Sequence, residues 1–173
     1  MKAFIFSMAL LIFDAATAQS NTRLHSGLGL GNDVSSYFAL DYGSYFLKKE
    51  SKFNIGSRLG MFYYNFDNNK LTNDSKLYGS LAFSLKYQIT NKFTFQVDSG
   101  TKIPLGKSKV AFLDEMNNEI PDSDIGRHTY SMPVLSYNLN KDNSVFLGYH
   151  FVFEDQLDMN TLSLGLRLSL SGD

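Results

Sequence analysis

Five charged residues of this chain could act together if folding brings them into one interior. They are Arg23, Asp41, Arg58, Asp98 and Arg167, and each falls in a segment where apolar and polar residues alternate. A charge that is buried without a partner is costly, so an enclosed set of this kind must pair internally. We expect an interior charge network in which Asp41 pairs with Arg58. Asp98 would serve Arg58 or Arg167, and a charge-gated narrow conduit is the functional alternative to structural pairing.

Histidine and serine could form an acyl-ester hydrolase site only if they shared one face. His128 and Ser131 are three positions apart, so on a strand they point to opposite faces. His150 has no serine two positions further on, and the chain has no cysteine to act as a nucleophile or a thiolate ligand. The sequence also lacks a phosphate-binding loop and metal-ligand spacing. We therefore predict no catalytic residue and no cofactor, and the sequence leaves metal binding open.

Strands must position these residues, because polarity alternates at period two along most of the chain. In the last such segment the leucines from Leu162 to Leu170 fall on one face and Arg167 falls on the other. In seven segments the apolar stripe carries no charge, whereas the opposite faces carry ten charges. An eighth segment has two possible outward faces, one before and one after Pro133, and we expect a bulge there. The eight segments are 22–31, 36–47, 52–64, 75–89, 92–103, 128–139, 144–153 and 161–170.

The direction in which the stripes face decides between a membrane barrel and a soluble one. A lipid-facing Lys or Arg costs roughly 2–4 kcal/mol at mid-bilayer, which accounts for charge-free stripes. An eight-stranded barrel is only just wide enough for side chains to fill, so the many large apolar groups do not fit inside. Four aromatic residues also lie in the outward register near tight turns, as in an aromatic girdle: Phe46, Phe53, Tyr87 and Phe93.

The predicted fold is all-β, an eight-stranded antiparallel up-and-down transmembrane β-barrel with a plugged polar lumen. Its connections alternate between tight turns, such as 90–91 and 140–143, and longer segments, such as 65–74 and 106–127. This alternation is typical of short periplasmic turns at one barrel end and longer external loops at the other. The alternative is a soluble secreted barrel of lipocalin type that binds a small apolar ligand inside.

The first eighteen residues predict a signal peptide and not part of the fold. Lys2 precedes an apolar run from Ala3 to Phe13, and Ala16-Thr17-Ala18 supplies the small residues of a cleavage site. This run is shorter than the roughly 20 apolar residues of a spanning helix. Residues 19–173 then form one barrel domain. The net charge of −1 argues against a nucleic-acid partner, for which a basic face is expected.

The chain resembles the small outer-membrane β-barrel proteins, the OmpA transmembrane-domain and OmpW-like group. The resemblance rests on Ala16-Thr17-Ala18, on Gly27-Leu28-Gly29-Leu30-Gly31 and on the strand from Leu162 to Leu170. It implies a monomer in the cell outer membrane of a Gram-negative cell, inserted by the barrel-assembly machinery and surrounded by lipid and lipopolysaccharide. It also implies a structural or surface-interaction role through the longer external loops. A weaker alternative is a lipid A-modifying hydrolase, because that family also uses eight strands.

Acidic residues gather in the longest connection of the predicted barrel. Carboxylate oxygens are the ligands that hard divalent cations prefer, so an external loop of this kind could hold such cations against lipopolysaccharide phosphates. No calcium-loop spacing is present, and a solvated loop is the simpler interpretation. The candidate cation contacts are Asp114, Glu115, Glu119, Asp122 and Asp124.

Overall fold

The structure of the chain is a computed structural model, and ten strands make up its regular secondary structure. It describes residues 19–29, 34–46, 51–66, 75–105, 112–113, 119–120, 128–153 and 159–169. Among these residues there is no helix of the length and apolarity needed to cross a membrane. The strands are β1 (Gln19–Gly29), β2 (Val34–Tyr45), β3 (Phe53–Phe66), β4 (Ser75–Gln88), β5 (Phe93–Pro104), β6 (Phe112–Leu113), β7 (Glu119–Ile120), β8 (His128–Asn138), β9 (Asn143–Phe153) and β10 (Thr161–Ser169).

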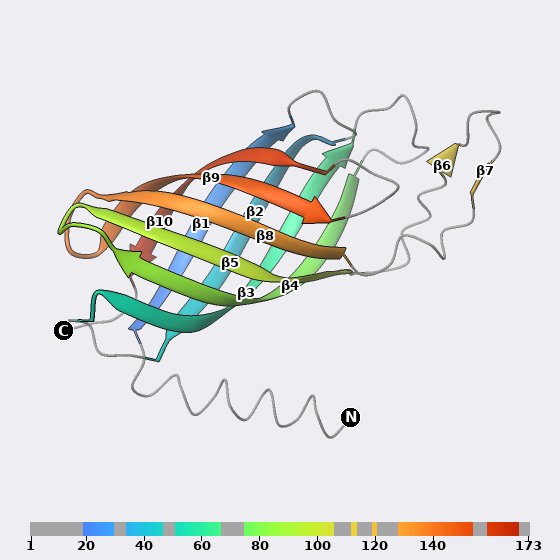
Figure 1. Ribbon diagram of the computed structural model, residues 1–173. Coiled ribbons are helices and arrows are strands. Elements are labelled where there is room, and N and C mark those ends of the chain that lie inside the picture. The colour runs from blue at the N-terminus through green and yellow to red at the C-terminus, as the bar shows by residue number, and fades with distance from the viewer. Residues whose placement is uncertain are drawn as a thin grey trace, which may run out of the picture.

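Eight of these strands close into an antiparallel barrel in the order β1-β10-β9-β8-β5-β4-β3-β2. Each strand pairs with the barrel strands nearest to it in sequence, and β1 pairs with β10 to close the cylinder (Figure 1). Closure leaves no unpaired strand edge, which a bilayer interior demands because it offers no water to backbone groups. The predicted eight-stranded up-and-down barrel is confirmed. The short β6–β7 hairpin between β5 and β8 was not predicted.

The two ends of the barrel differ in their connections. At one end, here called the turn end, residues 89–92 and 139–142 join β4 to β5 and β8 to β9 (Figure 1). In these turns Thr90 Oγ1 accepts the N–H of Phe93 at 3.0 Å, and Asn140 Oδ1 accepts the N–H of Asn143 at 2.7 Å. The other end, here called the loop end, has the connection from β5 to β8, with β6 and β7 beyond the barrel (Figure 1).

The apolar stripes face outward along the whole barrel. Leu164 is 64% exposed and Phe83 is 52% exposed, whereas Arg23 and Arg58 on the opposite face are buried. Phe46, Phe53, Tyr87 and Phe93 are all exposed, in the outward register that the sequence predicts. This surface suits hydrocarbon, because burying apolar area is favourable and burying unpaired charge is not. The barrel therefore has the surface of a transmembrane β-barrel.

Strand β8 keeps one register throughout, so the expected bulge at Pro133 is wrong. Its pairing with β5 runs without a shift, with Val97 opposite Pro133. Tyr130, Met132 and Val134 all face the lumen and are buried. Tyr130 enters the aromatic loop-end half, whereas Met132 and Val134 lie opposite Asp98 and Gln96 in the register, so apolar side chains also enter the lumen at the level of its polar groups.

Two charges that the alternation assigns to the inward face lie outside the lumen. Lys52 and Lys92 are exposed, because β3 begins at Phe53 and β5 begins at Phe93 and both lysines precede those strands. Alternation therefore predicts a lumen-facing side chain only for residues that lie within a paired strand, and not for residues that precede it.

Glycines on the inward face make room for large side chains opposite them. A Cβ on Gly27 would lie 2.1 Å from Tyr37 Cε1, and a Cβ on Gly165 would lie 2.4 Å from His25 Cβ. Real carbon atoms do not approach this closely, so a side chain at either position would collide with its neighbour. The lumen is therefore packed tightly enough at these positions to require glycine.

The outward orientation predicts the effect of a charge on the lipid-facing surface. Leu164→Lys places an ammonium group at the middle of β10 and should lower stability by roughly 2–4 kcal/mol, or prevent folding. Leu164→Phe should fold like the wild type. The measurement is refolding into phospholipid vesicles, followed by a gel on which the folded barrel migrates faster before heating than after it. Equal folding of both variants would contradict the assigned faces.

The crowded lumen predicts a difference between two glycine substitutions. Gly165→Ala forces Cβ against His25 and against the carbonyl oxygen of Leu24, 2.6 Å away, and overpacking of this kind costs roughly 1–3 kcal/mol. Gly79→Ala is the matched outward control, because its nearest neighbour would be Leu105 Cδ2 at 3.3 Å. Urea unfolding monitored by the same gel should give a lower midpoint for Gly165→Ala alone. A similar loss in both variants would show that strand glycines matter for another reason.

Candidate functional site

The centre of the lumen holds an ion-pair cluster of Arg23, Asp41, Arg58 and Asp98. Arg23 on β1 lies directly opposite Asp41 on β2 in the strand register. Its Nε donates to Asp41 Oδ1 and its Nη2 to Asp41 Oδ2, both at 3.0 Å, which is the bidentate geometry of a strong charge-assisted pair. Its Nη2 also lies 2.7 Å from Asp98 Oδ2 on β5, so one guanidinium joins the two carboxylates.

Arg58 completes the cluster from β3. Its Nη1 donates to Asp41 Oδ1, and its Nε lies 3.8 Å from Asp98 Oδ2. Gly43 stands opposite Arg58 in the register, and a Cβ there would lie 2.5 Å from Arg58 Nη2. The absence of a side chain at Gly43 therefore lets the guanidinium turn toward Asp41. All four members of the cluster are buried, with two positive charges facing two negative ones.

Neutral polar groups surround the cluster and use its remaining hydrogen-bonding capacity. Ser84 Oγ and Gln96 Nε2 each donate to Asp98 Oδ1 at 2.5 Å. His25 Nε2 lies 2.9 Å from Asp41 Oδ2, and it is the donor because a carboxylate only accepts. Arg58 Nη2 donates to Asn21 Oδ1 at 2.8 Å. These hydrogen bonds hold the charged side chains in fixed rotamers, in addition to the ion pairs between them.

Arg167 lies outside the cluster. Its Nη2 donates to Gln96 Oε1 at 2.7 Å, and Gln96 in turn reaches Asp98. Of the two partners considered for Asp98, Arg58 lies 3.8 Å from it and Arg167 reaches it only through the Gln96 amide, while Arg23 lies closest, at 2.7 Å. The structure brings four of the five expected residues into direct contact and links the fifth through one side chain.

A relay of four buried groups leads from the cluster toward the loop end. His25 contacts Asp41 through Nε2, and its Nδ1 lies 3.0 Å from Tyr37 Oη. Tyr37 Oη lies 2.5 Å from Ser163 Oγ. The sequence gives no sign of this relay, since its members are spread over β1, β2 and β10. Only the closing of β1 onto both neighbours brings them together.

Aromatic side chains fill the loop-end half of the lumen. Most of them pack around the buried amino group of Lys102, whose Nζ lies 4.2 Å from the ring centre of Phe62 and 2.7 Å from His150 Nε2. Lys102 also donates to Tyr64 Oη, and none of the described carboxylates lies within ion-pair distance of it. Ring faces and two polar atoms therefore surround the amine in place of a carboxylate. The aromatic residues of this half are Tyr37, Phe62, Tyr64, Phe66, Tyr78 and Tyr130, whereas Phe146 lies against Arg23, with its ring centre 5.4 Å from Arg23 Cζ.

One feature of the sequence could have indicated this aromatic half. Phe62, Tyr64 and Phe66 occupy alternate inward positions at the loop end of β3, and Tyr78 does so on β4. Aromatic residues on a nominally polar face mark an apolar section of the lumen. The charge pattern alone predicts a polar lumen from end to end, which is too simple.

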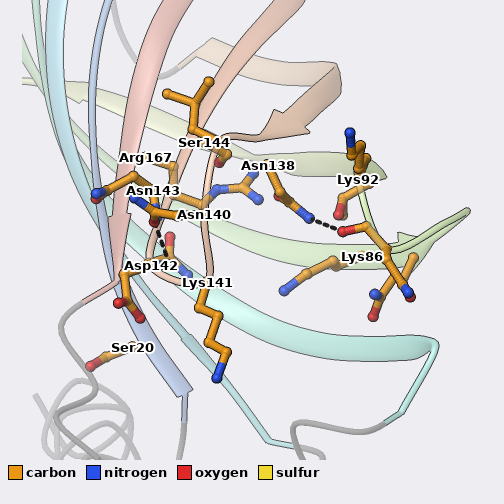
Figure 2. A pocket seen from close by; sticks show the side chains of 15 residues that line it. Ser20, Lys86, Lys92, Asn138, Asn140, Lys141, Asp142, Asn143, Ser144 and Arg167 are labelled. Carbon is orange, nitrogen blue, oxygen red and sulfur yellow. Dashed lines mark hydrogen bonds between the residues drawn. The ribbon is translucent and has the colours of Figure 1, made fainter.

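The turn end of the lumen opens into a cavity of about 640 Å³, here called the turn-end vestibule. Arg167 and Lys86 reach it from β10 and β4, and Lys92 and Lys141 reach it from the two turns (Figure 2). The remaining lining is mostly asparagine, serine, threonine and glutamine, with Asp142 as the one acidic residue among the described lining groups. The sequence did not predict this opening, because the turns contribute half of its basic groups.

The histidine and serine considered for a hydrolase do not share a face, and most of the candidate cation contacts lie outside the described residues. His128 is buried in the lumen, whereas Ser131 lies on the outward face beside Ser99. Within the described residues there is no group of three or more His, Asp or Glu that could hold a metal ion. The expected cation contacts Asp114, Glu115, Asp122 and Asp124 lie outside the described residues. Glu119 lies in β7, paired with Leu113.

The ion-pair cluster predicts a large loss of stability when one carboxylate is neutralised. Asp41→Asn leaves Arg23 and Arg58 facing Asp98 alone, and breaking a buried pair of this kind costs roughly 3–5 kcal/mol. Asp142→Asn, on an exposed turn, should change stability by less than about 0.5 kcal/mol. Urea titration of both folded proteins in vesicles measures the difference. Equal midpoints would mean that the cluster contributes nothing to stability.

Comparison with known proteins identifies the fold. No family model and no curated protein matches this sequence. Among solved structures, the outer-membrane protein Ail of Yersinia pestis in a phospholipid bilayer nanodisc is similar, with a TM-score of 0.56 at 11% identity, covering 88% of this chain and 99% of that chain. The crystal structure of the same attachment invasion locus protein gives a TM-score of 0.54 at 12% identity, covering 88% and 97%.

A designed transmembrane β-barrel is similar to the same degree, with a TM-score of 0.54 at 9% identity, covering 88% of this chain and 95% of that chain. Identities this low carry the fold and nothing about function. This chain therefore has the fold of the small eight-stranded outer-membrane β-barrels.

Proposed function

We propose that this chain is an outer-membrane protein whose barrel is a closed anchor and whose longer loop-end connections carry a structural or surface-binding role. The observation that carries the proposal is the filled lumen. The ion-pair cluster occupies its centre, and the aromatic residues around Lys102 occupy the loop-end half. A barrel filled in this way offers no wide path for water or solutes.

The loop end supports the second half of the proposal. Connections 67–74, 106–127 and 154–158 leave the barrel at this end, whereas the turns at 89–92 and 139–142 are tight. In outer-membrane barrels the longer connections face outward from the cell, where binding residues on loops meet lipopolysaccharide or other partners. Divalent cations held between the acidic residues of 106–127 and lipopolysaccharide phosphates remain a prediction from the sequence.

The two alternatives fit the geometry less well. A lipocalin-type carrier would turn its apolar stripes inward around a ligand, and here Leu164 and Phe83 face outward while the centre is charged. A hydrolase needs a nucleophile that substrate can reach. Ser163, the serine that Tyr37 links to the His25–Asp41 pair, is fully buried. We therefore assign the buried hydroxyl and imidazole groups to lumen packing.

Topology and conductance test the proposed function together. An epitope inserted within 106–127 should bind antibody on intact cells, whereas the same epitope at Lys141 should bind only after the outer membrane is opened. The purified folded barrel should show no conductance in planar bilayers at any voltage, with a water-filled porin as the positive control. Labelling of the Lys141 insertion on intact cells would reverse the proposed orientation, and steady conductance would contradict the closed lumen.

A further inference from the structure

We propose that the turn-end vestibule binds a small oxyanion, a phosphate or carboxylate group carried by a soluble molecule. Four basic side chains reach this cavity, and one acidic side chain among the described residues opposes them. In the view of Figure 2, Lys86 and Lys92 lie on one side of the opening, and Arg167 and Lys141 lie on the other. Low-dielectric walls focus such a field and raise the local concentration of anions.

Arg167 is the residue of the vestibule that most favours a bound ligand. Unlike a basic side chain at a solvated rim, it is buried. It is only 7% exposed, and its Nε has no hydrogen-bond partner. Its Nη2 is held by Gln96 Oε1, and Tyr45 Oη donates to the same oxygen at 2.7 Å. The guanidinium is thus fixed in orientation at the edge of the vestibule, with its Nε buried and unpaired. No described carboxylate lies within ion-pair distance of it.

Lys86 adds a second, half-buried basic group to the vestibule. Its Nζ lies 5.1 Å from the ring centre of Tyr45 and has no ion-pair partner among the described side chains. Burying two cations in one cavity is unfavourable unless an anion accompanies them. A planar guanidinium can bind a phosphate or carboxylate through two parallel hydrogen bonds, and a nearby ammonium group adds a point charge.

The remaining lining suits the polar body of such a molecule. Asn91, Asn138, Asn140 and Asn143 present amides around the rim, and these groups can donate to or accept from hydroxyl and carbonyl groups. The volume of about 640 Å³ is that of a small-molecule site and too small for a folded partner. If the proposed orientation is correct, the ligand comes from the periplasm. The binding itself does not depend on that orientation.

Calorimetric titration of the full folded chain in micelles of an uncharged detergent tests the proposal. The probes are pyrophosphate and the tricarboxylate tricarballylate, each at constant ionic strength. We expect saturable binding of at least one probe. Saturation by pyrophosphate alone would assign a phosphate ligand, saturation by tricarballylate alone a carboxylate ligand, and saturation by both a general oxyanion site.

Matched variants locate the binding. Lys86→Gln should weaken binding roughly ten-fold or more, because it removes a charge-assisted contact. Arg167→Gln should do the same, and the heat-dependent gel shift shows whether it still folds. Lys52→Gln is the control, because Lys52 is an exposed lysine that precedes β3 and does not line the vestibule. Asp142→Asn should tighten binding by removing the opposing charge.

Two outcomes would overturn the proposal. The first is that neither probe saturates the wild-type chain. The second is that Lys52→Gln weakens binding as much as Lys86→Gln, which would indicate general electrostatic attraction.

Discussion

The whole structure depends on one constraint, which is that ionised side chains have only the inside of the cylinder to occupy. Hydrocarbon around the barrel excludes charge from the outward face, and the closed sheet leaves no edge at which a charged residue could reach water. The inward face of eight strands is narrow, so the charges placed there lie within contact distance of one another. Arg23 between Asp41 and Asp98 is the direct result.

This constraint also explains the glycines and the aromatic residues of the lumen. Large charged and aromatic side chains fill a cylinder of fixed width only where the opposite positions are empty. Gly43 leaves space for Arg58, and Gly27 leaves space for Tyr37. Lys102 is accommodated differently, through ring faces and polar atoms at the loop end. Buried basic side chains are thus surrounded by carboxylates at the centre of the lumen and by aromatic rings and polar atoms in its loop-end half.

The charge balance inside the barrel connects the ion-pair cluster with the turn-end vestibule. Asp41 and Asp98 balance Arg23 and Arg58, and this leaves Arg167 and Lys86 without described counterions. Both lie where the lumen meets the vestibule. Gln96 joins the two regions, since it contacts both Arg167 and Asp98. The proposed oxyanion site therefore lies at one end of the barrel, apart from the ion-pair cluster.

The amino-acid sequence by itself determined the strands, their outward faces, the number of barrel strands and the presence of interior charges. These follow from alternation along single strands, which is a local property that each segment carries on its own. Contacts between inward residues of neighbouring strands could also be predicted, as with Asp41 and Arg58. The inward face of β8 could not be predicted, because Tyr130 and Leu135 are both apolar and only the packing around them distinguishes lumen from lipid.

Tertiary structure decided everything that depends on which inward residues face one another across the lumen. The contact of Arg23 with Asp98, the relay from Asp41 to Ser163 and the aromatic surroundings of Lys102 each join strands that lie far apart in sequence. The turn-end vestibule likewise needs β4, β10 and two turns to meet. Alternation states that a side chain points inward, but the width, tilt and stagger of the closed barrel determine what it meets there.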